Sequence, residues 1–205
     1  MNDALKDKKV FISFQGVATS IFVWVNGIFV GYSEDSFTPS EFEISDYLVE
    51  GDNKLAVAVY RYSTASWLED QDFWRLYGIF RDVYLYAIPK VHVQDLFVKG
   101  DYDYQTKAGQ LDIDLKTVGD YEDKKIKYVL SDHEGIVTEG DASVKADGEL
   151  SVSIEDLQIK PWSAESPKLY NLTLHVLDDD QVVEVVPVKV GFRHFEIKDK
   201  LMLLN

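Results

Sequence analysis

The sequence predicts an all-β protein built from two successive domains, and three observations support this. Apolar residues alternate with small or polar ones in short runs such as 55–59, which is the period of a half-buried strand. Two β-rich runs flank Asn26-Gly27, a dipeptide typical of a tight β-hairpin. After Pro89, aromatic residues thin out and Asp, Lys and Val dominate. We therefore place a domain boundary near residue 90.

Two further strands are expected in the first domain, over residues 53–62 and 79–88. In the second of these, we expect Phe80, Val83 and Leu85 to face inward at a slightly irregular period. These side chains would contribute to the apolar core of the domain.

Two short helical turns are expected between the strands of the first domain. The segment TPSE has the pattern of a capping box, with Thr38 as N-cap, Pro39 at the first helical position and Glu41 at the third. Residues 45–48, followed by Gly51, predict a second single turn.

The second domain is expected to be a sandwich of the immunoglobulin kind. Short β-like segments recur at regular spacing, and DHEG, ADGE and DDDQ supply turn signals between them. The absence of cysteine does not count against this fold, because many such sandwiches have no disulfide. The segments are 91–98, 110–118, 125–130, 149–154, 169–177 and 182–190, and residues 195–205 begin a new strand pair.

Composition excludes several classes of partner. The net charge of −15 argues against nucleic acid and against anionic membrane surfaces, both of which attract basic patches. No cysteine is present, so no disulfide or thiolate chemistry is expected. The first residues, MNDALKDKK, contain no apolar run typical of a signal peptide, and no stretch is long enough to span a bilayer. We therefore expect a cytoplasmic protein.

The four histidines give no pattern of a metal site. None of them has a second histidine or a cysteine at ligand spacing, so we expect no zinc site. No nucleophile elbow or glycine-rich phosphate loop is present either.

Residues 66–80, SWLEDQDFWRLYGIF, combine acids and rings in one segment between strands. A sugar offers C–H faces that stack on rings and hydroxyls that donate to carboxylates, so a carbohydrate site is one interpretation. The other is a domain joint, in which Arg75 and Arg81 pair with the acids; residue types alone favour this interpretation. The acids are Glu69, Asp70 and Asp72, and the rings are Trp67, Phe73, Trp74, Tyr77 and Phe80.

A paired-carboxylate glycosidase within this chain is a third hypothesis. Asp70 and Asp72 point the same way if the segment is extended, and retaining glycosidases need two carboxyl groups about 5 Å apart. Both residues, however, lie in a loop of a small β domain with no evident partner to form a cleft. We rank this hypothesis below the other two.

Longer motifs resemble the β-galactosidases of glycoside hydrolase family 2. The run LEDQDFWRLYGIFRDV is highly specific, and the resemblance extends from about residue 10 to the C-terminus. The other matching pieces are FQGV, VWVNG, VGYSEDS, PSEFEIS, GDNKLAV, PWSAESPKLYNL and VGFRHFEI.

The resemblance implies a fold for each part of the chain. Residues 1–90 would be a galactose-binding-like jelly roll without its N-terminal strands, and residues 91–197 the family's immunoglobulin-like sandwich. Residues 198–205 would lead into a catalytic (β/α)8 barrel. The chain would then be an internal fragment of a longer enzyme, with an open sheet edge.

The resemblance also implies a role for particular residues. Family members hydrolyse terminal β-galactosides, such as lactose, with retention, using two glutamates on the barrel that have no counterpart here. The second aspartate of DQD, Asp72, would reach into the barrel's site to bind galactose and a sodium ion. Glu69, Asp70, Trp74 and Arg75 would support that loop. Magnesium is a further cofactor expected in the full-length enzyme.

Other readings remain open at this point. A stand-alone carbohydrate-binding module would bind sugar without a barrel. A scaffold that mediates assembly would show a concentration-dependent mass, and family members often form homo-oligomers. The β-glucuronidases and β-mannosidases of the family rank below the β-galactosidases, because LEDQDFWRLYGIF has the β-galactosidase form.

Overall fold

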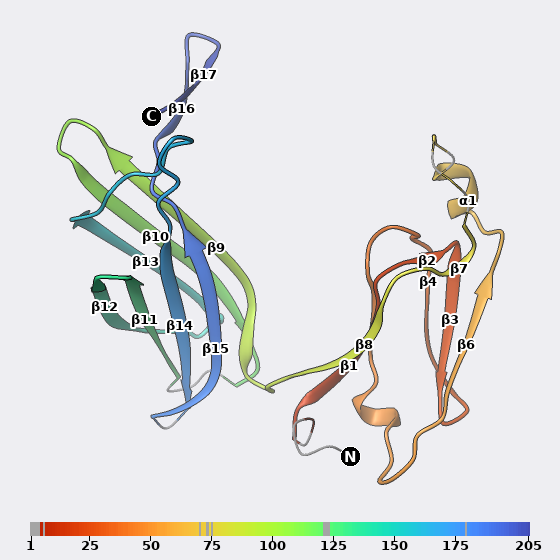
Figure 1. Ribbon diagram of the computed structural model, residues 1–205. Helices are drawn as coiled ribbons and strands as arrows, with labels where there is room; N and C mark the ends of the chain where they lie inside the picture. The colour runs from red at the N-terminus through yellow and green to blue at the C-terminus, as the bar shows by residue number, and fades with distance from the viewer. Residues whose placement is uncertain are drawn as a thin grey trace. The chain divides into compact units, whose positions relative to one another are not determined.

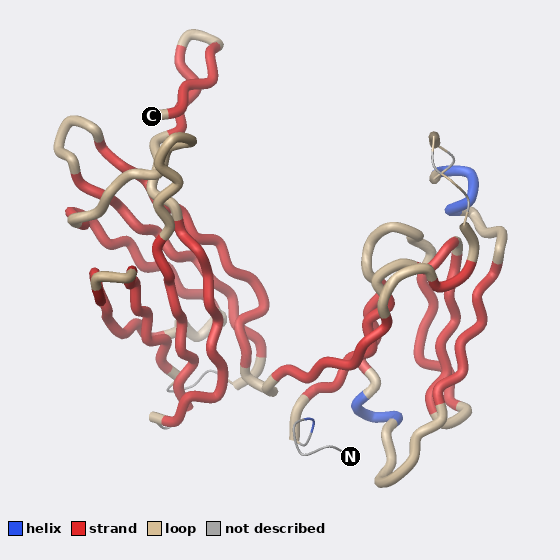
Figure 2. The backbone as a smooth tube through the Cα atoms, in the orientation of Figure 1, coloured by secondary structure: helices blue, strands red, loops and turns tan. Residues whose placement is uncertain are grey.

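The computed structural model describes residues 5, 7–69, 71–72, 74, 76–120, 124–178 and 180–205. Strands dominate both of its compact units, residues 1–90 and residues 91–205 (Figures 1 and 2). No helix in the described part of the chain is long and apolar enough to cross a membrane.

Unit 1 is a sandwich of two three-stranded antiparallel sheets, with strand orders β5-β1-β8 and β4-β3-β6. A two-stranded pair, β2-β7, lies beside them. The bounds are β1 Lys9–Phe14, β2 Val17–Ala18, β3 Ser20–Val25, β4 Ile28–Ser33, β5 Ser40–Glu43, β6 Leu55–Tyr60, β7 Gly78–Ile79 and β8 Val83–Ile88.

Alternation within β1 and β3 builds the core of unit 1. Val10, Ile12 and Phe14 point inward from β1 and are almost fully buried. Ile21 and Val23 do the same from β3, and all five belong to one apolar cluster. Because successive side chains of a strand face opposite ways, the residues between them lie on the outer faces of the sheets.

The hairpin predicted at Asn26-Gly27 is confirmed. Both residues have positive φ, +52° and +83°, as a type I′ turn requires, and they join β3 to β4. The Asn26 side chain also ties the turn to later segments. Its Nδ2 donates to the carbonyl of Tyr47 at 2.8 Å, and its Oδ1 accepts from the amide of Lys54 at 2.9 Å.

The helix predicted at TPSE is wrong. Residues Ser40–Glu43 form β5, which pairs with β1, and Thr38 lies in a turn that Asp35 closes by accepting its amide at 3.0 Å. Tertiary pairing with β1 therefore overrides the local capping pattern. The second predicted turn is confirmed as a 3₁₀ turn over Ser45–Tyr47.

The expectation for residues 79–88 is only partly correct. β8 forms, but it begins at Val83, so Phe80 precedes it. Val83 pairs with Phe14 and Leu85 with Ile12, which places both on the core-facing side of the sheet. They are nevertheless 41% and 52% exposed, because β8 is the edge strand of its sheet and no described residue of unit 1 covers them.

Unit 2 has the two-sheet arrangement expected of an immunoglobulin-like sandwich. One sheet has the order β13-β10-β9 and the other β12-β11-β14-β15, and leucine, isoleucine and valine side chains fill the core between them. The bounds are β9 His92–Asp103, β10 Ala108–Val118, β11 Lys125–Asp132, β12 Gly135–Ser143, β13 Glu149–Leu157, β14 Tyr170–Asp178 and β15 Gln181–Val190.

The sequence did not predict strand β12 (Gly135–Ser143), but it did predict the strand pair near the C-terminus. β12 reads GIVTEGDAS and is an edge strand, so it does not show the regular alternation of a strand with one buried face. The expected pair near the C-terminus is confirmed as β16 Phe195–Lys198 and β17 Leu201–Leu204.

The Asn26 contacts predict a stability effect. We expect Asn26→Ala to lower the opening free energy of β3 and β4 by about 2 kcal/mol, because three side-chain hydrogen bonds, including one to Asn53 Oδ1 at 2.8 Å, and a residue tolerant of positive φ are lost. Native-state hydrogen exchange of the β3 amides measures this. Asn26→Gly keeps the backbone freedom and should still cost about 1 kcal/mol; wild-type protection in Asn26→Gly would show that the side-chain bonds contribute nothing.

Candidate functional site

The segment rich in acids and rings follows the end of β6 within unit 1 (Figure 1). It begins with a single helical turn, α1 (Ala65–Leu68), and returns to the sandwich at β7. Trp67 is 86% exposed and Trp74 is 90% exposed, so these rings contribute little to the core. An exposed ring that is not needed for packing is available to a ligand or a partner surface.

Glu69 anchors the segment where α1 ends. Its Oε1 accepts from the backbone amide of Ser36 at 2.8 Å, and its Oε2 accepts from the Ser36 hydroxyl at 2.6 Å. Ser36 is 2% exposed, so this pair of bonds is formed against the buried part of unit 1. Both carboxylate oxygens of Glu69 are thus engaged within unit 1, and its expected role in supporting the Asp72 loop stays a prediction.

Glu34 anchors the same segment where α1 begins. One carboxylate oxygen accepts from the Thr64 hydroxyl and from the Ala65 amide, the latter at 2.9 Å. The other oxygen accepts from the hydroxyl of Tyr32. The bond from Thr64, followed by that from Ala65, holds the pKa of the Glu34 carboxyl below its ordinary value. The two glutamates, Glu34 and Glu69, together form what we call the carboxylate clamp.

A small pocket of about 260 Å³ lies under the segment. Its described walls are mainly apolar, and the carboxylate among the described lining residues is that of Glu69, each of whose oxygens accepts a hydrogen bond from Ser36. The pocket therefore offers apolar surface rather than a set of free hydrogen-bonding groups. It is lined by Ala18, Thr19, Ser36, Phe37, Ser66, Glu69, Trp74, Leu76, Tyr77 and Phe80.

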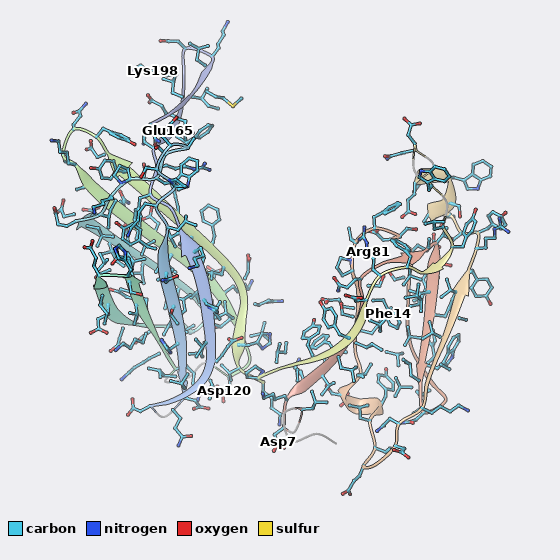
Figure 3. The ribbon with its side chains drawn as sticks, viewed as in Figure 1. Asp7, Phe14, Arg81, Asp120, Glu165 and Lys198 are labelled. Carbon is cyan, nitrogen blue, oxygen red and sulfur yellow. The ribbon has the colours of Figure 1, made fainter. Side chains whose placement is uncertain are left out.

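No ion pair joins Arg81 to Glu69 or Asp72, the two acids of the segment that lie within the described residues, in contrast to the domain-joint interpretation. Arg81 lies between β7 and β8 (Figure 3), and its Nη1 donates to the carbonyl of Phe37 at 2.8 Å and to that of Gln15 at 3.2 Å. The guanidinium also lies 5.2 Å from the centroid of the Phe80 ring. Arg81 thus fixes loops beside the pocket by binding main-chain oxygens.

Asp72 is the described acid of this segment that remains free to act. Its side chain is exposed, and it makes no hydrogen bond or ion pair with any residue in the described ranges. Of the other predicted site residues, Trp74 lines the pocket, while Asp70 and Arg75 lie outside the described residues. The hypothesis that Asp70 and Asp72 form a catalytic pair stays untested, because Asp70 is outside the described residues.

The described residues do not by themselves fit a metal ion. No group of three or more histidine, aspartate or glutamate side chains in the described parts of the chain could hold one. Asp72 can offer a hard carboxylate oxygen of the kind that cations such as sodium prefer. The other ligands of such an ion would have to come from groups other than the described residues.

Sequence reasoning missed Glu34 and Ser36. Glu34 is 31 residues from Ala65, and Ser36 is 33 residues from Glu69. No local spacing rule connects residues so far apart, and both bonds arise because folding brings the segment after β4 beside α1. The only sequence signal was that both residues belong to the matching piece VGYSEDS.

Family comparisons match both units. Residues 2–89 match the sugar binding domain of glycosyl hydrolases family 2, and residues 91–193 match a second model described as glycosyl hydrolases family 2. These matches and the two sandwiches define the chain as paired β modules of a carbohydrate-hydrolase family. The chain belongs to glycosyl hydrolases family 2.

Individual relatives show which enzymes of the family this chain is similar to. The chain is 95% identical over 205 residues to a beta-galactosidase of Streptococcus thermophilus, and 54% identical over 208 residues to one of Clostridium acetobutylicum. The alignments cover 100% of this chain but only 20% and 23% of those relatives, so the chain spans about a fifth of their length. The predicted resemblance is thereby confirmed.

Solved structures agree on the fold. A Bifidobacterium dentium beta-glucuronidase complexed with coumarin-3-O-glucuronide superposes with a TM-score of 0.81 at 18% identity. The match covers 100% of this chain and 40% of that one. The all-β fold class of two successive sandwiches is confirmed.

The clamp predicts how Glu69 variants behave. In Glu69→Ala, we expect the Ser36 amide to exchange at least tenfold faster, because a hydrogen bond to a charged acceptor stabilises by roughly 1.5–3 kcal/mol. Glu69→Gln retains an acceptor and should restore part of the protection. Glu50→Ala is the matched control, since Glu50 is exposed and bonds to no residue in the described set. Unchanged exchange in Glu69→Ala would contradict the clamp.

The lowered pKa of Glu34 predicts a pH effect. A carboxyl whose folded pKa lies below its unfolded value stabilises the fold above the unfolded pKa, about 4.3 for glutamate, and this stabilisation is lost as pH falls through the folded pKa. The Ala65 amide resonance should therefore move with an inflection below that value. Glu34→Gln should abolish the inflection and Glu50→Gln should leave it; an inflection that survives Glu34→Gln would assign it to another group.

Proposed function

We propose that this chain is the non-catalytic N-terminal portion of a retaining β-galactosidase that hydrolyses terminal β-galactosides such as lactose. Its contribution to the site is the segment after α1, which brings Asp72 to the galactose. The supporting observation is that every carboxylate oxygen of Glu34 and Glu69 accepts a hydrogen bond within the fold, while Asp72 stays exposed and unpaired among the described residues. The named relatives supply the enzyme class.

Asp72 is suited to orienting a sugar. A carboxylate has two oxygens and can accept hydroxyl protons from two adjacent positions of a pyranose ring. The exposed ring of Trp74, two residues away, can pack against an apolar sugar face. Such groups bind and position substrate, whereas bond cleavage requires two further carboxyl groups, to which we assign no residue of this chain.

A sodium ion would suit this arrangement, with Asp72 as one of its ligands. The ion would supply a fixed positive charge beside the sugar hydroxyls. For magnesium, the described residues offer no ligand set, so that expectation concerns the remainder of the enzyme. Homo-oligomer formation and a cytoplasmic location likewise belong to the proposed whole enzyme.

A stand-alone carbohydrate-binding module is the second candidate for the same segment. It would require useful galactose affinity from this chain by itself. One carboxylate and one ring contact only part of a sugar, so most of its hydroxyls stay hydrogen-bonded to water. Binding must also offset the translational and rotational entropy that the sugar loses. We therefore expect galactose binding by the isolated chain to be weak or undetectable, and saturable binding at low millimolar galactose in calorimetry would favour the module.

Complementation tests the proposed function. We expect the 205-residue chain alone to hydrolyse no chromogenic β-galactoside, and to restore hydrolysis when mixed with the separately expressed remainder of the parent enzyme. Asp72→Asn should lower the restored kcat/KM by about 100-fold, since losing a charge-assisted contact to substrate costs roughly 3 kcal/mol.

Asp52→Asn is the matched control, because Asp52 is also exposed but lies in the loop before β6. It should leave the restored activity unchanged. Hydrolysis by the chain alone would overturn the non-catalytic assignment, and full activity in the Asp72→Asn mixture would overturn the role of Asp72.

A further inference from the structure

Five aromatic rings form one continuous layer on the outer side of the β4-β3-β6 sheet. Phe22 is central, with ring centroids 4.5 Å from Tyr32, 5.4 Å from Tyr60 and 6.2 Å from Trp24. Phe29 completes the layer, 5.6 Å from Trp24 and 6.4 Å from Phe22. We call these five residues the aromatic face.

Strand geometry explains why the rings gather there. Phe22 and Trp24 alternate along β3 with the buried Ile21 and Val23, so they point away from the core. Tyr32 pairs with Phe22, and Phe29 pairs with Trp24. The odd spacing of the two β4 residues is absorbed by a register shift between Val23 and Trp24.

The layer is open to solvent and bordered by small residues. Phe29 is 49% exposed and Tyr60 is 56% exposed, so the rings do not hide each other completely. On the β6 side, Ala58 pairs with Phe22 and Ala56 with Trp24, so the neighbouring side chains across β6 are methyl groups. None of the five residues lines the pocket under the segment after α1.

The chemistry of this surface fits a neutral sugar chain. Rings stack on the apolar faces of pyranoses. The Tyr60 hydroxyl can donate to and accept from sugar hydroxyls, and the Tyr32 hydroxyl, which donates to Glu34, can accept from one. The five residues and the two alanines beside them include no aliphatic branched side chain and no lysine or arginine. An anionic ligand would moreover meet a chain of net charge −15.

A second copy of the chain is a poorer fit. The layer is three strands wide and about five residues long, so with strands about 4.8 Å apart and a rise of about 3.4 Å it covers on the order of 250 Å². A stable protein interface buries about 800 Å² on each partner. A second chain would also bring another −15 of charge to the contact.

We propose that the aromatic face is a second, non-catalytic binding site for extended, neutral oligosaccharides of β-linked hexoses. It would hold a sugar chain against unit 1 independently of Asp72. This inference goes beyond the proposed galactosidase role and would stand even if Asp72 proved to have no part in hydrolysis.

Titration of the 205-residue chain with cellohexaose, followed by amide NMR, tests the proposal. We expect saturable shifts confined to β3, β4 and β6, with lactose binding at least tenfold more weakly because it covers fewer rings. Trp24→Leu keeps an apolar side chain but removes the stacking surface, and it should weaken binding at least tenfold. Tyr60→Ala is a second variant at an exposed strand end and should weaken it too.

Two controls separate this site from the segment after α1. Trp67→Leu removes an exposed tryptophan of that segment, and Asp72→Ala removes its free acid; both should leave cellohexaose binding unchanged. No saturable shifts, or binding lost in Asp72→Ala and kept in Trp24→Leu, would overturn the proposal. A concentration-dependent mass that Trp24→Leu abolishes would also overturn it, in favour of a second copy of the chain.

Discussion

The two bonds between Glu69 and Ser36 are the constraint on which the candidate site depends. Between α1 and β7, the described residues form no helix or strand and the ring of Trp74 is exposed, so the position of this segment depends on how α1 is held at one end and β7 at the other. Glu69 places both carboxylate oxygens on one nearly buried serine, which fixes the end of α1 against unit 1. Glu34 fixes the beginning of α1 by accepting a hydrogen bond from the amide of Ala65. Without these contacts, the carboxylate of Asp72 would sample more positions, and the orientation that the proposed sugar contact needs would be lost.

The acids of this segment therefore differ in role although they are alike in type. The carboxylates of Glu34 and Glu69 accept hydrogen bonds within the fold, whereas Asp72 is exposed and makes no such bond with a described residue. Glu34 adds a second connection, because its other oxygen accepts from Tyr32, a member of the aromatic face. The clamp and the aromatic face thus share one carboxylate, and a change at Glu34 affects the edges of both surfaces.

How far the sequence predicts this structure depends on the range of each interaction. The Asn26-Gly27 hairpin was predictable because its dihedral requirements lie within two residues. The capping box at Thr38 failed because pairing of β5 with β1, absent from any local pattern, decides the outcome. The partners of Glu34 and Glu69 are separated by more than thirty residues, so no spacing rule could reveal the clamp. The spacing of the β-like segments indicated the second sandwich, and the residue types drew attention to residues 66–80. The first sandwich and the role of Asp72 were indicated only by the long family motifs, which reflect the whole fold.

The Asp72 segment and the aromatic face also differ in how many binding groups from outside this chain each would need to hold a sugar. A galactose site must satisfy several hydroxyls at once, and Asp72 can satisfy two, so most of the recognition would come from residues beyond those described. Stacking is less demanding, because each ring of the aromatic face contributes apolar contact without a precisely placed partner. Such a surface can act alone on a weak, extended ligand. A loop tip with one free acid gains affinity only when other groups complete the site, and this is the arrangement expected of a module that supports catalysis performed elsewhere.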